Sequence, residues 1–271
     1  MTGRDGWQHP GRRGALLYTV AAGMAGVGVA AMARRAVARQ PGRRSDAQQL
    51  PGGPIIVVSN HTSYADGILL ALACRDLGRS VRLLATAGVF RMPLIGSVAD
   101  RLGFIPVQRG SSHAADSLEQ AAQALAHGEA VALFPEGRIT REQDHWPERA
   151  KTGAVRLALR SGAPVIPVAM DGAHEVIGDR AHLLRLLRNL ALPPQVRVLV
   201  GEPIDVTRLV GSVPDEQSVR RVADEVMGTL VDLVEQLRGQ PAPSAEWRGG
   251  AAGAPVGSHP SDTDVPSGAD R

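Results

Sequence analysis

Short runs of apolar, often β-branched residues alternate along the chain with longer stretches in which apolar residues recur every three or four positions. The short runs predict buried strands and the longer stretches predict amphipathic helices. Strands are predicted at 55–58, 81–85, 104–107, 130–134, 165–169 and 196–200. Helices are predicted at 68–77, 93–102, 114–126, 152–159 and 217–237. This alternation predicts an α/β fold with a mixed or mostly parallel sheet flanked by helices.

The stretch 14–33 contains no charged side chain and is rich in glycine and alanine. A helix of this length, at about 1.5 Å per residue, extends about 30 Å, which is the thickness of the hydrocarbon core of a bilayer. Three interpretations are open: a membrane anchor that spans the bilayer or lies on it, a cleaved export signal, and a buried helix. We favour the anchor, and therefore expect an N-terminal membrane-associated helix to precede the sheet.

Arginines flank this stretch unevenly, with three before it and five after it between residues 34 and 44. If the stretch spans the bilayer, the positive-inside rule predicts that the main domain lies at the cytoplasmic face of the cell membrane. A basic segment beside apolar sequence favours a membrane lipid surface as a partner. Nucleic acid is not expected as a partner, because modules that stack on bases need exposed aromatic residues and these make up only 3% of the chain.

Composition divides the chain into four parts. Residues 1–39 are the basic N-terminus with the anchor helix, and residues 40–53, which are rich in proline and glycine, form a linker. Residues 54–239 hold the predicted strands and helices. The tail at 240–271 consists largely of small and polar residues that bury little surface, and we expect it to be disordered.

The most informative stretch joins the strand at 55–58 to the following helix. A polar run that begins at His61 and ends at Asp66 separates the two elements. A histidine with a carboxylate five residues later is a base with an orienting partner, because the carboxylate can fix the imidazole tautomer and stabilise the imidazolium. The alternative is structural. Ser63 and Asp66 are spaced almost as in a capping box, so Asp66 would only satisfy amides at the helix N-terminus.

Three other positions carry candidate anion-binding or polar groups. Arg109 follows the strand at 104–107 and offers the forked donors that phosphate favours, although a strand-end arginine is often only a surface charge. Glu136 lies in a bend after the strand at 130–134, at the mouth of the sheet where open α/β folds bind ligands. Alternatively, Glu136 only pairs with a nearby arginine. Lys151 precedes a helix start, where its charge and the free amides suit an anion.

Four stretches, in order and at the usual spacing, resemble the sequence blocks of the glycerophospholipid acyltransferases, the 1-acyl-sn-glycerol-3-phosphate acyltransferase family. They are Asn-His-Thr-Ser-Tyr-Ala-Asp at 60–66, Gly-Phe-Ile-Pro-Val-Gln-Arg-Gly at 103–110, Phe-Pro-Glu-Gly at 134–137 and Val-Ile-Pro-Val-Ala-Met at 165–170. The resemblance covers about residues 54–175, and the stretch 146–154 is similar to one that is frequent in actinobacterial members. One block alone is weak evidence, whereas four together are strong.

The resemblance implies that residues 54–239 are an acyltransferase domain. It would move a fatty acyl group from acyl-CoA or acyl carrier protein to the free hydroxyl of lysophosphatidate, with no metal, no cofactor and no enzyme nucleophile. His61, held by Asp66, would deprotonate the acceptor hydroxyl, and backbone amides near residues 62–63 are candidate donors to the oxyanion. The residues implied to hold the acceptor are Arg109, Glu136, Gly137, Arg138, Thr140 and Lys151.

The third block departs from the family pattern, because the usual continuation is Gly-Thr and here Gly137 is followed by Arg138, with Thr140 two residues later. The departure leaves the acceptor open. Lysophosphatidate comes first, another lysophospholipid second and glycerol-3-phosphate third. A membrane-tethered lipid-binding module without catalysis is the non-enzymatic alternative. Serine or zinc hydrolase chemistry is not expected, because the sequence has neither Gly-x-Ser-x-Gly nor His-Glu-x-x-His.

Overall fold

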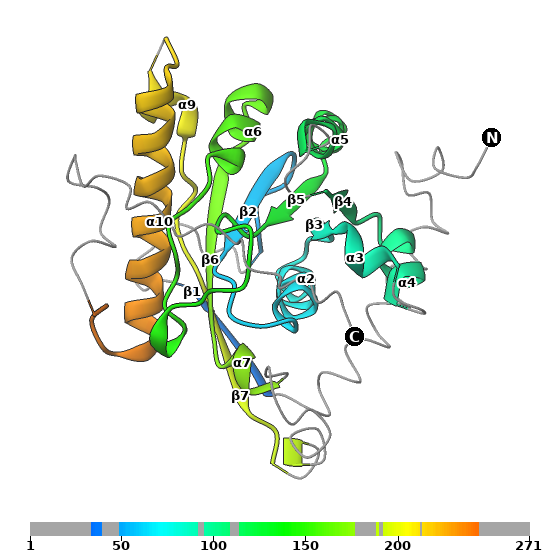
Figure 1. Cartoon of the computed structure of the whole chain (residues 1–271), viewed down its shortest axis with the longest axis vertical. Coiled ribbons are helices and arrows are strands. Elements are labelled where there is room, and N and C mark those ends of the chain that lie inside the picture. The colour runs from blue at the N-terminus through cyan, green and yellow to red at the C-terminus, as the bar shows by residue number, and fades with distance from the viewer. Residues whose placement is uncertain are drawn as a thin grey trace, which may run out of the picture.

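Among the residues that the computed structural model describes, seven strands form one sheet in the order β1-β7-β6-β2-β5-β3-β4 (Figure 1). The structure describes residues 34–39, 49–91, 95–108, 114–176, 188–189, 192–211 and 213–243. In chain order, the strands are β1 (Arg34–Arg39), β2 (Ile55–Ser59), β3 (Val81–Thr86), β4 (Ile105–Val107), β5 (Ala130–Leu133), β6 (Val165–Asp171) and β7 (Gln195–Val200). Strand pairing is parallel throughout this sheet except between β6 and β7, which are antiparallel.

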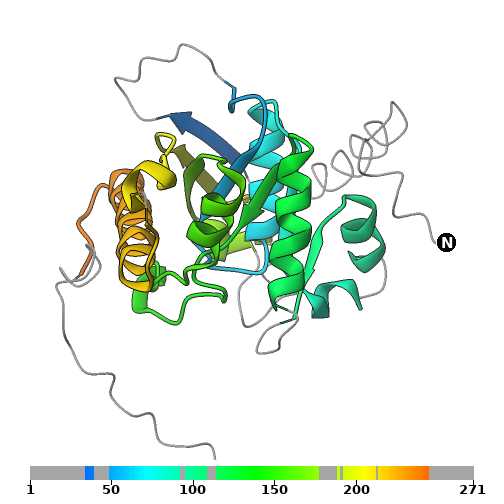
Figure 2. The same ribbon diagram turned by 90° about the horizontal axis from the view of Figure 1, so that it is seen from above.

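Helices cover both faces of the sheet (Figures 1 and 2). The helix α2 (Asp66–Asp76) packs on one face, and α5 (Ala114–Ala126), α6 (Gly153–Ser161) and α10 (Glu216–Arg238) pack on the other. The shorter helical elements are α3 (Ala87–Phe90), α4 (Ile95–Arg101), the 3-10 turn η2 (Gln143–His145), α7 (Ala173–Val176) and α9 (Val206–Val210). A mostly parallel sheet needs this cover, because both of its faces are apolar.

The strand β2 lies at the centre of the sheet, between β6 and β5, and its four apolar residues are fully buried. Successive side chains of a strand point to opposite faces. Ile55 and Val57 therefore join the core beneath α2, and Ile56 and Val58 join the core beneath α5, α6 and α10. Each such side chain stabilises the fold by about 1.5–3 kcal/mol. The residues that follow β2 thus start from a rigid support.

The closing helix α10 shows how local sequence sets an element's ends. Asp215 caps its N-terminus by accepting a hydrogen bond from the backbone N–H of Ser218, and the Ser218 hydroxyl lies 3.0 Å from the backbone nitrogen of Asp215. At the other end, Gly239 takes the left-handed conformation, with φ of 69°, that favours glycine at a helix end. The buried face of α10, which includes Val222, Val226 and Leu230, packs on the sheet.

The predicted α/β fold is confirmed, and each predicted strand and helix is present with ends within two residues of those expected. The strand β1 was not predicted, because its sequence, Arg-Arg-Ala-Val-Ala-Arg, has neither a continuous apolar run nor clear alternation. It pairs in parallel with β7 at the edge of the sheet, from Arg34 opposite Gln195 to Arg39 opposite Val200. Charged residues commonly occupy edge strands.

Several predictions fall outside the described residues: the membrane-associated helix at 14–33, most of the linker at 40–53, Arg109 and the tail from 244 onward. In the part of the chain that is described, no helix combines the length and the apolar composition needed to cross a bilayer. The division into four parts stays a prediction.

Candidate active site

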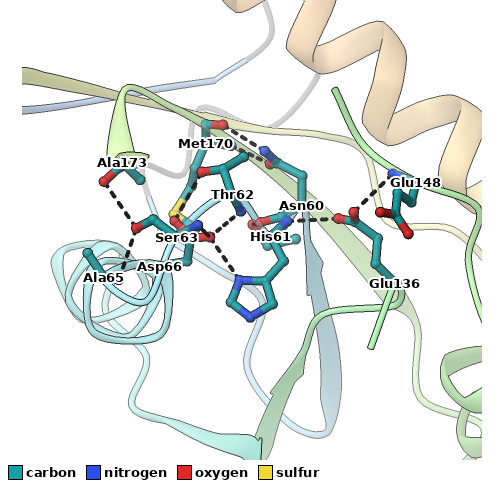
Figure 3. A network of polar contacts seen from close by, with 11 residues as sticks. Asn60, His61, Thr62, Ser63, Ala65, Asp66, Glu136, Glu148, Met170 and Ala173 are labelled. Carbon is teal, nitrogen blue, oxygen red and sulfur yellow. Dashed lines mark hydrogen bonds and ion pairs between the residues drawn. The ribbon is translucent and has the colours of Figure 1, made fainter. Parts of the chain in front are cut away.

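The loop after β2 begins with a side chain that ties it to the neighbouring strand β6. The Asn60 side-chain amide donates to the backbone oxygen of Met170 at 2.9 Å, and its oxygen accepts from the backbone nitrogen of Met170 at 2.8 Å (Figure 3). Both residues are buried. The amide side chain thus acts like one more backbone unit between β2 and β6, and it fixes the point from which His61 projects.

Asp66, the first residue of α2, is fully buried and joins the histidine to its loop. Its Oδ2 lies 2.9 Å from Nδ1 of His61 and accepts the backbone N–H groups of Thr62 at 2.5 Å and Ser63 at 2.8 Å (Figure 3). A carboxylate can only accept hydrogen bonds, so the proton of a neutral His61 ring sits on Nδ1. The other ring nitrogen, Nε2, is then unprotonated and can act as a base.

These contacts combine elements of the two interpretations of the His61–Asp66 spacing. Asp66 does bind backbone amides, as the structural alternative held, but they belong to the preceding loop. The N-cap residue of α2, Ala65, makes no side-chain capping bond. Instead the hydroxyl of Ser63 accepts from the backbone N–H of Ala65 at 2.9 Å and donates to the oxygen of Ala173 at 3.1 Å. One carboxylate therefore orders the loop and orients the imidazole together.

The expectation that amides near residues 62–63 donate to an oxyanion is wrong for this conformation. The N–H groups of Thr62 and Ser63 both point to Asp66 and are already used. A donor to a developing negative charge must come from another part of the site.

The His61 ring is also fixed by stacking. It lies nearly parallel to the ring of Phe134, with centroids 4.1 Å apart and an interplanar angle of 14°. Phe134 directly follows β5, so the neighbouring strand supplies the surface on which the imidazole rests. Stacking on one face and the bond to Asp66 on one edge leave the ring little rotational freedom.

His61 lines a cavity of about 460 Å³ that is bounded mainly by apolar side chains. The apolar wall comes from β3, β4, α5 and β5, and includes Leu83, Leu84, Val107, Leu118 and Leu133. Gly137 and Lys151 line the same cavity together with His61. A base and a cation beside an apolar space suit a ligand with a long hydrocarbon part and an anionic group.

The side chain of Lys151 lies so close to Gly137 that a larger residue at position 137 would press against it. Gly137 has a φ of 72°, and a Cβ atom there would lie 3.0 Å from Nζ of Lys151. The backbone N–H of Lys151 donates to the oxygen of Pro135 at 2.8 Å, which holds the lysine against this turn. Lys151 is the one lysine in the whole sequence, which otherwise uses arginine as its cation. Among the described residues, no carboxylate forms an ion pair with it within 4.0 Å.

Glu136 is 3% exposed, and its two oxygens bind two backbone amides. Oε1 accepts from the N–H of His61 at 2.8 Å and Oε2 accepts from the N–H of Glu148 at 2.9 Å (Figure 3). Burial raises the pKa of Glu136 to about 8, although both of these hydrogen bonds lower it. The alternative in which Glu136 pairs with an arginine is wrong in the part of the chain described here, because both partners are backbone groups.

Two further predicted residues are engaged with protein groups. Arg138 forms an ion pair with Glu148, at 2.6 Å between its Nη2 and Oε2, and Glu148 also accepts the backbone N–H of Arg141. The buried hydroxyl of Thr140 donates to the oxygen of Trp146 at 2.7 Å. Of the predicted residues, His61, Gly137 and Lys151 line the cavity, whereas Glu136, Arg138 and Thr140 are not among its lining residues.

Sequence reasoning missed Asn60 and Phe134 as supports of His61. Asn60 directly precedes His61 and Phe134 lies two residues before Glu136, but each role depends on a partner 110 or 73 positions away, as 170 − 60 and 134 − 61 give. A run such as Ser-Asn-His after a strand hints that the asparagine faces inward. The sequence gives no sign of its partner.

The family model described as Acyltransferase matches residues 43–171. The chain is 29% identical over 152 residues to the chloroplastic 1-acyl-sn-glycerol-3-phosphate acyltransferase BAT2 of Brassica napus, covering 56% of this chain and 41% of that protein. It is 32% identical over 196 residues to the lyso-ornithine lipid O-acyltransferase of Pseudomonas aeruginosa, covering 67% of this chain and 71% of the relative. The chain thus spans only about two fifths of the plant protein.

The fold is similar to that of a solved structure, the 1-acyl-sn-glycerophosphate acyltransferase PlsC from Thermotoga maritima. The TM-score is 0.59 with 20% sequence identity, and the match covers 83% of this chain and 81% of that chain. At this identity the likeness concerns the fold alone.

Proposed function

Because the chain belongs to the acyltransferase family that includes the 1-acyl-sn-glycerol-3-phosphate acyltransferases, we propose that it is an O-acyltransferase that acts on lysophosphatidate. It would move a fatty acyl group from acyl-CoA or acyl carrier protein to the free hydroxyl of the acceptor and form phosphatidate. The observation that carries the proposal is a histidine whose Nδ1 is held by a buried aspartate beside an apolar cavity.

The proposed reaction uses His61 as a general base. Nε2 takes the proton of the acceptor hydroxyl as its oxygen attacks the thioester carbonyl carbon, and the tetrahedral intermediate then breaks its C–S bond. The thiolate that leaves takes the proton from the imidazolium. In the neutral imidazole Asp66 holds the proton on Nδ1, which leaves the Nε2 lone pair for the acceptor hydroxyl, and Asp66 stabilises the imidazolium between the two proton transfers.

The two ends of the site would bind different parts of the substrates. The acyl chain fits the apolar cavity, and the ammonium of Lys151, which pairs with no carboxylate among the described residues, offers a charge for the acceptor phosphate. Arg138 is paired with Glu148 in this structure, so a phosphate would compete with Glu148 for its guanidinium. Arg109, which the family resemblance implicates, completes the proposed set of cations. Contact of Glu136 and Thr140 with the acceptor is implied by the family resemblance alone.

The proposal includes the setting in which the enzyme works. Lysophosphatidate and phosphatidate reside in the bilayer, so an anchor at 14–33 and a location at the cytoplasmic face of the cell membrane fit the chemistry. No cofactor beyond the acyl donor is proposed. Another lysophospholipid and glycerol-3-phosphate remain alternative acceptors, and the relative from P. aeruginosa is named for an acceptor lipid of a different kind.

The test measures thiol release by the purified full chain in detergent, with oleoyl-CoA and one acceptor at a time: lysophosphatidate, lysophosphatidylethanolamine or glycerol-3-phosphate. We expect release with lysophosphatidate and loss of that release in a folded His61→Ala protein. Release with a different acceptor would retain acyl transfer and change the head group. Release without any acceptor would indicate a thioesterase, and silence with both acyl-CoA and acyl carrier protein donors would leave the lipid-binding module.

A further inference from the structure

One buried carboxyl group beside the site has no part in the proton transfers. Glu136 follows the carboxyl end of β5 and is not among the residues that line the cavity. Its oxygens are 2.8 Å from the backbone nitrogen of His61 and 2.9 Å from that of Glu148. A buried carboxyl group with two backbone partners and no place in the cavity wall calls for a role other than binding the acceptor.

The turn that carries Glu136 holds the His61 backbone at two points. Glu136 accepts the N–H of His61, and the N–H of Thr140 donates to the carbonyl oxygen of His61 at 2.7 Å. Asn60 fixes the preceding residue to Met170. Every backbone polar group of His61 is therefore satisfied by a fixed partner. The side-chain bond to Asp66 is a separate, third constraint.

We propose that Glu136 is a positioning residue: it holds the backbone of His61, and through it the Asp66-bound imidazole, and it ties this backbone to the segment that carries Glu148. The catalytic part of this proposal rests on the proposed function. Reacting groups must be held within a fraction of an ångström of their productive geometry, and a displacement of about 1 Å can slow a reaction by about 100-fold. The family resemblance implies a different role, contact with the acceptor.

The two roles give different kinetics. A residue that contacts the acceptor equally in the ground and transition states raises the acceptor KM when it is removed. A residue that positions the base lowers kcat and leaves both KM values nearly unchanged, because the lipid and the thioester bind elsewhere. Measuring whether KM or kcat changes therefore distinguishes acceptor contact from positioning of the base.

The experiment compares Glu136→Met, which removes both acceptor oxygens at similar volume, with Glu136→Gln, which keeps one carbonyl oxygen. The matched control is Glu129→Met. Glu129 precedes the same strand at its opposite end, where it pairs with Arg82, so its loss removes a largely buried carboxyl group far from His61. We expect kcat to fall about 10- to 100-fold in Glu136→Met and less in Glu136→Gln, with acceptor and donor KM within about two-fold of wild type.

A second measurement does not depend on turnover. The full chain is labelled with nitrogen-15 histidine, and the His61 signals are assigned by their absence from His61→Ala. In Glu136→Met we expect the His61 amide proton to move upfield, because its hydrogen bond is lost, and the ring-nitrogen shifts of His61 to change with it. The Glu129→Met protein should keep the wild-type His61 signals.

The outcomes separate this proposal from the proposed function. A raised acceptor KM with kcat retained in Glu136→Met would overturn the positioning role and favour acceptor contact. Unchanged His61 signals in that variant would also overturn it, whether or not the wild type turns over. If wild type releases no thiol with any acceptor, the proposed function fails. Even in that case, shifted His61 signals in Glu136→Met would support the conclusion that Glu136 positions the backbone of His61.

Discussion

The base half and the anion half of the candidate site are held by different kinds of contact. In the base half, Asn60, Ser63 and Asp66 are short, buried side chains that bind backbone groups. In the anion half, Arg138 and Lys151 are long side chains that reach solvent, and the Arg138 side chain is 49% exposed even though it pairs with Glu148.

This difference shows how one site combines fixed chemistry with an adjustable ligand contact. Short buried side chains lose little rotamer freedom, and the backbone partner of Asn60 belongs to the interior strand β6. A half-exposed ion pair is worth only about 0–1 kcal/mol, so a charged ligand can replace one of its members. The base half therefore holds its groups in a fixed geometry, and under the proposed function the anion half would exchange partners when the acceptor phosphate binds.

The largest expected effect comes from breaking the base half at Asp66. Asp66→Asn replaces an oxygen that accepts from the ring and two amides with a group that must donate on one side, so the imidazole loses its fixed tautomer. We expect kcat to fall about 1,000-fold or more. Thiol-release assays would measure this, with Asp76→Asn at the exposed end of the same helix as control. A kcat within ten-fold of wild type would contradict the assignment.

The next effect tests the anion half at Lys151. Lys151→Met keeps an unbranched side chain of nearly the same length and removes the charge, so we expect the acceptor KM to rise about 10-fold or more, with a smaller change in kcat. Lys151→Arg should recover part of the affinity. Because Lys151 is the one lysine of the chain, carbon-13 methylation of its amine gives a single side-chain signal besides the N-terminus. That signal should shift with lysophosphatidate, and its failure to shift in an active enzyme would remove Lys151 from the phosphate site.

A smaller effect concerns stability and the proton of Glu136. Burial raises the pKa of Glu136 from 4.5 to about 8, so between these values the folded protein holds a proton that the unfolded chain releases. The contribution is therefore complete below about pH 4.5 and is lost as the pH rises to about 8, at up to about 1.4 kcal/mol per pH unit.

Glu136→Gln removes this titration. Urea unfolding at a series of pH values should show that the wild type loses stability relative to Glu136→Gln between about pH 5 and 8, with a flat difference above that range. A difference that stays constant from pH 5 to 8 would show that Glu136 titrates near its ordinary pKa.

The smallest effect sharpens the comparison at Glu148. Glu148→Gln weakens the ion pair that occupies Arg138 and leaves the backbone N–H that Glu136 accepts. Arg138 then becomes free for an anionic acceptor, and we expect the acceptor KM to fall by up to about five-fold, the equivalent of one half-exposed ion pair. Steady-state kinetics at constant ionic strength would measure it. A higher KM would mean that Glu148 itself helps to bind the acceptor.

The sequence by itself determined the α/β fold, the strands and helices apart from β1, and the pairing of His61 with Asp66. Each of these follows from local patterns. The run at 55–58 is continuously apolar because β2 is buried on both faces, and five residues of separation place Asp66 within reach of the ring. The strand β1 was not predicted because an edge strand lacks that continuous apolar run.

Only the tertiary structure decided what surrounds this pair. It assigned the amides of Thr62 and Ser63 to Asp66, removed them as oxyanion donors, and gave Glu136 two backbone partners. Met170, the partner of Asn60, and His61, one of the two partners of Glu136, lie 110 and 75 positions away in the chain. Such contacts exist because strands distant in sequence become neighbours in the sheet. A local sequence pattern indicates whether a residue is buried and in which element it lies. The hydrogen-bond partner of a buried polar group is determined only by the assembled sheet.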